Sequence, residues 1–199
     1  MTEAEPPKSN WHRYGWIIGF VGAFGLGVGL YSADQKKEPD PVSVEDKATN
    51  ARARSLQDKL GQIEQRPVAS IEDYIRKTAE AAPIIDEAKG LLRLQIGSVE
   101  RFKQQHASSN KDVMIAGYAV RMFQKEQELM SLMGDEIYCA RALESLPVEK
   151  RTGYYDENVV PLKEKEKRVL TEWAAIAREA QAKGVSWSAA VTNATQQVQ

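Results

Sequence analysis

The chain has 199 residues, with 27 lysines and arginines against 28 aspartates and glutamates, so its formal net charge is −1. This length suits one anchor segment plus one domain of ordinary size. The near balance of charge argues against a nucleic-acid-binding protein, which needs a basic surface to replace condensed counterions, and against disorder driven by high net charge. The single cysteine, Cys139, excludes an intramolecular disulfide framework.

The first distinctive segment is uncharged and runs from residue 15 to 33, with an apolar centre from Trp16 to Tyr31. A helix rises about 1.5 Å per residue, so this centre would cover about 24 Å, slightly less than a hydrocarbon core of about 30 Å. Local thinning of the bilayer can compensate for the difference. Aromatic rings stand at both ends, where they prefer the headgroup zone. We therefore predict a transmembrane helix over 15–33, after a short polar tail at 1–14.

Two alternatives to a membrane-spanning helix stay open from the sequence. In a buried helix of a soluble protein, each of the many glycines would cost about 1 kcal/mol relative to alanine. A cleaved signal peptide needs small residues before the cut, but a cut after Ala33 would place the bulky Tyr31 at one of these positions. Both arguments favour the membrane anchor.

Glycine is frequent in the predicted anchor, and two pairs have the GxxxG spacing. Residues four apart share a helix face, and missing side chains there let a second helix approach closely. We expect the anchor to pack against another transmembrane helix, either its own copy or that of a partner. The alternative is that glycine is simply common in membrane helices. The residues expected at this contact are Gly15, Gly19, Gly22, Gly25 and Gly29.

The charges that flank the segment do not decide its orientation. Lys8, Arg13 and the α-amino group precede it, and Lys36, Lys37 and Lys47 follow it at similar distances, which is a tie under the positive-inside rule. A short N-terminal tail is the usual layout of a signal anchor. We therefore expect a single-pass membrane protein. In a bacterium it would lie in the inner membrane, with a cytoplasmic N-terminus and a periplasmic C-terminal domain.

Helical signals dominate the rest of the chain, and no segment alternates with period two for long. We predict an all-α fold, in which an antiparallel bundle of three to four long helices follows the anchor. A Pro-containing linker at 34–42 leads to this bundle at 43–185, and a short helix with a polar tail follows at 186–199. Caps, prolines and glycines place the helices at 43–65, 70–81, 83–107, 111–146 and 161–183.

Proline and serine carry most of these boundaries. Ser70 with Asp73 resembles a capping box, and Pro83 suits the first turn of a new helix, where its missing N–H costs nothing. The helix at 111–146 has a wide apolar stripe and should be contacted from two sides. Residues 147–157 are expected to form a loop. The less apolar helix at 43–65 is either a fourth bundle member or a stalk.

Few residues suggest chemistry. The histidines His12 and His106 form no Glu-x-x-His pair for a di-iron site, no Cys-x-x-Cys-His motif for haem and no serine triad with a nucleophile elbow. We therefore predict no catalytic residue, no metal and no cofactor. Cys139 is expected to be a buried, inert thiol. Tyr154 and Tyr155 in the expected loop could contact a partner, because tyrosines offer large area at low entropy cost; the alternative is that one ring packs under the bundle.

The charged run at 163–168 mixes both signs and is expected to be a solvated helix face. Together these observations favour a non-enzymatic, membrane-anchored interaction protein, an accessory, assembly or scaffold subunit of a larger membrane complex. Its partners would be other membrane proteins or its own copy, and not nucleic acid. One alternative is a membrane-tethered ligand-sensing or binding bundle, which would need a cavity with convergent polar groups. Another is a tethered cell-wall enzyme, for which the domain carries no signature.

Overall fold

A computed structural model describes residues 41–105, 107–108 and 110–185 of the chain. These ranges hold no strand, which confirms the predicted all-α class and the helical bundle. None of the helices that they contain is long and apolar enough to cross a bilayer. The predicted anchor at 15–33 and the tail at 186–199 lie outside the described residues. The helical elements are α2 (Pro41–Glu64), α3 (Ile71–Gln105), α4 (Asn110–Ser145), α5 (Val148–Tyr154), the π-helix η2 (Tyr155–Val159) and α6 (Val160–Ala182).

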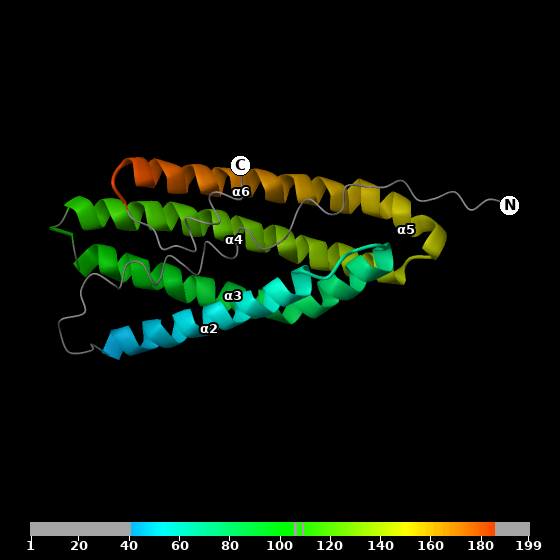
Figure 1. Cartoon of the computed structure of the whole chain (residues 1–199), viewed down its shortest axis with the longest axis horizontal. Coiled ribbons are helices and arrows are strands. Elements are labelled where there is room, and N and C mark those ends of the chain that lie inside the picture. Colours follow the sequence, from blue (N-terminus) through cyan, green and yellow to red (C-terminus); the bar gives the residue numbers. More distant parts are fainter. Residues whose placement is uncertain (1–40, 106, 109, 186–199) are drawn as a thin grey trace.

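The long helices lie side by side and alternate in direction (Figure 1). Successive helices form the main contacts, with α2 on α3, α3 on α4 and α4 on α6. The start of α2, the α3–α4 connection and the end of α6 lie at one end of the bundle, and α5 lies at the other (Figure 1). The bundle is therefore elongated, and its two ends carry different parts of the chain.

Helix α2 packs as a bundle member over its second half. Its buried side chains are Ala53, Leu56, Leu60 and Ile63, which recur at steps of three and four and so share one face. This face lies against α3. Burial of a leucine such as Leu56, which is 1% exposed, stabilises the fold by about 1.5–3 kcal/mol. The helix begins at Pro41, within the predicted linker, as suits a proline in a first helical turn.

Helix α3 corrects one prediction. The sequence predicted two helices, at 70–81 and from Pro83, but the structure has one helix of 35 residues with Pro83 inside it. An internal proline removes a backbone hydrogen bond and costs about 3 kcal/mol. Ala82 and Ile85 on either side of it are buried, and their packing offsets this cost. The predicted cap is confirmed, since Ser70 Oγ accepts from the Asp73 N–H at 3.1 Å and Asp73 Oδ2 accepts from the Ala69 N–H at 3.2 Å.

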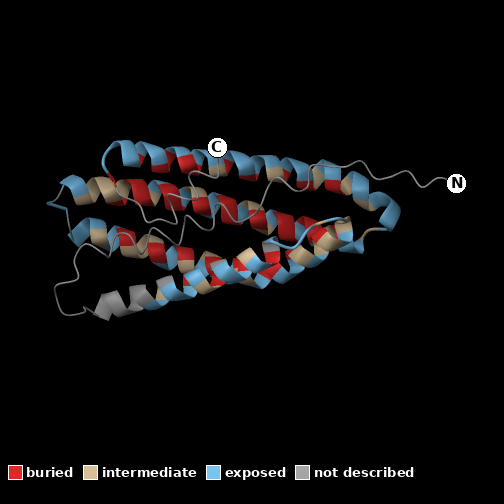
Figure 2. Ribbon diagram, viewed as in Figure 1, coloured by how far each residue is buried: buried red, intermediate tan, exposed pale blue. Residues whose placement is uncertain are grey.

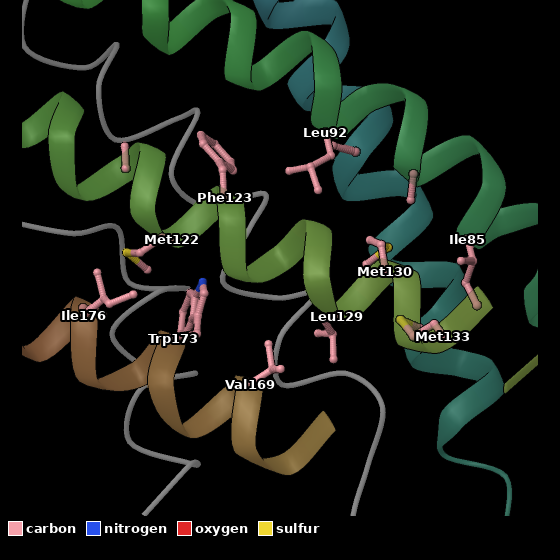
Figure 3. Packing of buried hydrophobic residues seen from close by; sticks show 14 of the residues in the cluster. Ile85, Leu92, Met122, Phe123, Leu129, Met130, Met133, Val169, Trp173 and Ile176 are labelled. Atoms are coloured by element: carbon pink, nitrogen blue, oxygen red, sulfur yellow. The ribbon is translucent and has the colours of Figure 1, made fainter. Parts of the chain in front are cut away.

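Helix α4 is the central helix, as its wide apolar stripe predicted. It contacts α3 on one side and α6 on the other, and buried positions recur along its whole length (Figure 2). Phe123 and Leu92 lie between α4 and α3, whereas Met122 and Trp173 lie between α4 and α6 (Figure 3). The main hydrophobic core therefore follows both sides of this helix.

The segment after α4 corrects a second prediction. A loop was expected at 147–157, but Leu146 and Pro147 alone separate α4 from a helical run that continues to Ala182. Arg151 explains this tight turn. Its Nε donates to the Leu146 carbonyl at 3.0 Å and its Nη2 to the Glu144 carbonyl at 3.2 Å, so its side chain binds the end of α4.

The sequence predicted a helix over 161–183, and α6 ends at Ala182, shortly before Gly184. This residue has a φ of 83°, the left-handed conformation that favours glycine. Its N–H donates to the Gln181 carbonyl at 2.9 Å, and the Val185 N–H donates to the Ala180 carbonyl at 3.0 Å. These two bonds form a Schellman motif, and the buried Val185 side chain completes it.

Candidate functional site

The most unusual feature of the described interior is a group of three charged side chains between α4 and α6. Glu136 belongs to α4, whereas Lys163 and Glu166 are three residues apart on α6 and therefore share a helix face. Lys163 Nζ lies 2.5 Å from Glu136 Oε1 and 3.2 Å from Glu166 Oε2. The side chain of Lys163 is 17% exposed, that of Glu136 is 0% exposed and that of Glu166 is 9% exposed. We call these three residues the acid–lysine cluster.

The cluster corrects the expectation that the run at 163–168 is a solvated face. Lys163 is half-buried and Glu166 is buried, while the other residues of this run are exposed. On a helix, positions 163 and 166 point the same way, and here they point toward α4 rather than toward water. Buried charges are stable only when they are paired, and Lys163 is the cation that contacts both carboxyl groups.

Aromatic rings from two further elements lie near the cluster. Tyr74 of α3 and Tyr155 of η2 are buried and meet edge to face, with ring centroids 5.2 Å apart and planes at 90°. Burial raises the pKa of both phenols, and the charge of Glu136 raises these pKa values further. Both rings therefore lie near the carboxyl group of Glu136.

These rings belong to a hydrophobic cluster that is distinct from the main core. We call it the end cluster. It gathers at the end of the bundle where α5 reverses the chain (Figure 1). Its buried members are Tyr74, Cys139, Ala140, Leu143, Tyr155, Val159 and Leu162.

The π-helix η2 positions the aromatic part of this site. The Val160 N–H donates to the Tyr155 carbonyl, which is the i to i+5 bond of a π-helix. Asn158 Nδ2 donates to the Tyr154 carbonyl at 3.0 Å and so satisfies a group in this irregular turn. Tyr155 and Val159 point inward from η2, and Lys163 follows one turn later. Single-turn π-helices occur often at functional sites, so η2 is a candidate part of a functional site.

The charges of the acid–lysine cluster do not cancel. Two carboxylates face one ammonium, so full ionisation would leave one uncompensated negative charge in the interior. Burial raises the pKa of Glu136 well above its usual value; the ammonium of Lys163 opposes this shift and the carboxylate of Glu166 adds to it. The arrangement therefore favours the protonated form of Glu136.

A second buried carboxyl group lies in the main core. Glu126 of α4 is 1% exposed, and the indole N–H of Trp173 donates to its Oε1 at 2.8 Å. Burial raises the pKa of Glu126 well above its usual value, and the hydrogen bond from Trp173 opposes this shift only in part. Glu126 therefore favours the neutral form in the folded protein.

The sequence interpretation missed both buried glutamates of α4. Glu126 falls between Met122 and Leu129, and Glu136 follows Met133 by three residues. These steps of three and four keep both acids on the apolar face, and a charged residue at such a position is a usable signal. The pairing of Glu136 with Lys163 has no such signal, because it depends on how α4 and α6 are aligned.

The residues predicted for a site are placed as follows. Tyr155 is buried against Tyr74, whereas Tyr154 is half-buried and forms a hydrogen bond with the buried Cys139. Both tyrosines are helical, and their contact with a partner stays a prediction. In the described ranges no group of three or more His, Cys, Asp or Glu side chains could hold a metal ion. Several residues that were considered for a site or for helix packing lie outside the described part: His12, His106, Gly15, Gly19, Gly22, Gly25 and Gly29.

Comparison with known proteins gives no relative: no family model, no curated protein and no solved structure matches this chain.

Proposed function

We propose that this protein is a single-pass, membrane-anchored interaction protein without enzymatic activity, which serves as an accessory, assembly or scaffold subunit of a larger membrane complex. The observation that carries the proposal is the uncharged, glycine-rich segment at 15–33, which precedes the helical bundle. Its GxxxG faces suit close contact with a second membrane helix, from another protein or from a second copy.

The layout of the bundle supports this role. Residues 34–40 can span at most about 24 Å between the anchor and Pro41. The end of the bundle that contains Pro41 would therefore lie close to the membrane. Helix α4 has 36 residues and is about 54 Å long, so the opposite end, with α5, can reach well away from the bilayer. The sides of such an elongated bundle offer partners a large surface.

The anchor is tested by fractionation of the full chain and of a variant that lacks residues 1–40. We expect the full chain in the membrane fraction after carbonate extraction, and the variant, which keeps the whole described bundle, in the supernatant. Full extraction of the intact chain by carbonate would contradict the proposal, since a spanning helix resists this treatment.

The contact role of the glycines is tested by Gly19→Leu and Gly25→Leu, with Phe24→Leu as the control. Phe24 lies about 140° from Gly19 and about 100° from Gly25 around the predicted anchor helix, and so points away from both glycines. We expect the glycine variants to lose co-purifying membrane proteins, or the second copy, in mild detergent, while all three variants stay in the membrane. Equal co-purification by the glycine variants and the control would contradict helix packing through this face.

A further inference from the structure

The uneven charge of the acid–lysine cluster has a consequence for the end of the bundle. Glu136 has no exposed surface, so no water can stabilise its charge in the closed structure. The ammonium of Lys163 can balance one carboxylate, and a second carboxylate would stay unbalanced. The folded end of the bundle therefore requires a proton at this place.

We propose that the acid–lysine cluster is a proton-sensitive switch, in which a proton held on Glu136 keeps α5 and η2 packed on α3 and α4, and loss of this proton releases them. The groups that face Glu136 fit this assignment. Lys163 and Glu166 face it from α6, Tyr74 from α3, Tyr155 from η2 and Cys139 from α4 itself. The phenols and the thiol are neutral, so they add no positive charge that could balance a second carboxylate.

The coupling to η2 passes through Tyr155. Its ring packs on Tyr74 and lies near the cluster, and Asp156 adds a further negative charge close to it. When Glu136 loses its proton, the unbalanced charge is stabilised only if water reaches it. Separation of η2 from Tyr74 admits this water and disturbs the smallest part of the fold. The end cluster is distinct from the main core, so this opening leaves the rest of the bundle closed.

The direction of the pH dependence follows from the raised pKa of Glu136. A carboxyl group whose pKa is higher in the folded state binds its proton more tightly there than in the opened state. Its stabilising contribution is therefore complete below the ordinary pKa of glutamate and is lost as the pH rises through the folded value. The switch is closed at low pH and opens at high pH.

Hydrogen exchange of the full chain, followed by mass spectrometry between pH 5 and pH 9 and corrected for intrinsic exchange rates, tests the proposal. In the wild type, protection of residues 148–162 should fall by up to tenfold per pH unit, the slope of a single linked proton. Glu136→Gln keeps the shape of the side chain without the titration, so its protection should be independent of pH. Protection that does not change with pH in the wild type would overturn the proposal.

Glu126→Gln is the matched control, because it changes a similarly buried carboxyl group of the same helix in the main core. It should keep the wild-type pH dependence at 148–162. If protection at 148–162 in Glu136→Gln fell with pH as steeply as in the wild type, the assignment of the switch to this cluster would be overturned. Should Glu136→Gln fail to fold, infrared spectroscopy of Glu126→Gln gives the answer, because this variant lacks the second buried carboxylic acid, that of the main core. A carboxylic-acid band that disappears over the pH range of the opening supports the proposal, and a band that persists through it contradicts it.

Discussion

Glu126 offers a direct measure of how strongly the core favours a neutral carboxyl group. In the folded protein its pKa is raised by burial, whereas in the unfolded chain it returns to an ordinary value. Above that ordinary value, folding must return a proton to the side chain, which costs about 1.4 kcal/mol for every pH unit up to the folded pKa. Glu126→Gln removes this cost and keeps an acceptor for the Trp173 N–H.

We therefore expect Glu126→Gln to gain stability over the wild type as the pH rises. The difference in the free energy of unfolding should grow by about 1.4 kcal/mol per pH unit above the ordinary pKa of glutamate, and stop growing at the folded pKa. Urea denaturation followed by circular dichroism at pH 5, 6, 7 and 8 measures it. The control is Glu128→Gln, an exposed acid of α4, which should follow the wild type. Parallel curves for Glu126→Gln and the wild type would refute the reasoning.

Three further substitutions test the corrected and confirmed helix boundaries by urea denaturation. Gly184→Ala should destabilise the fold by about 1–2 kcal/mol, because alanine resists the left-handed conformation. Gly153→Ala should stabilise it by about 0.5–1 kcal/mol, because this position is helical and has open space around its Cα. Similar shifts for both glycines would contradict the Schellman motif. Pro83→Ala should stabilise the protein by about 2 kcal/mol, because it restores a backbone donor within α3. A loss of stability would show that the proline ring is needed where it lies.

Local signals predicted well wherever the determining atoms are close in sequence. The end of α6 follows from Gly184, and the start of α3 follows from Ser70 and Asp73, because the groups that cap a helix lie within a turn of its end. The central place of α4 follows from its own wide apolar stripe. These features need no knowledge of the neighbouring helices.

The wrong predictions concern effects that other helices supply. Pro83 carries a local cost that the sequence displays, but the burial of its neighbours, which offsets it, depends on α3 packing against the rest of the bundle. Gly153 and the adjacent tyrosines resemble a loop, yet Arg151 binds the end of α4 and Tyr155 packs on Tyr74 from α3. Contacts between distant segments therefore decided both cases.

The candidate site was predictable from the sequence only in part. A stripe analysis could have found Glu136 as an acid on an apolar face, because its spacing is visible in the sequence. Its partner Lys163 stands in a run of alternating charges, where nothing local separates a buried lysine from a solvated one. The pairing follows only from the alignment of α4 with α6.

The proposed membrane-anchored interaction role is tested most directly by the size of the protein in native membranes. Chemical crosslinking of membranes, followed by solubilisation in mild detergent and detection of the chain, compares it with the 22.2 kDa monomer. We predict a crosslinked species of higher mass that contains a membrane protein or a second copy, and that is lost in Gly25→Leu. Recovery of only the monomer, in crosslinked and in uncrosslinked membranes, would contradict the proposal.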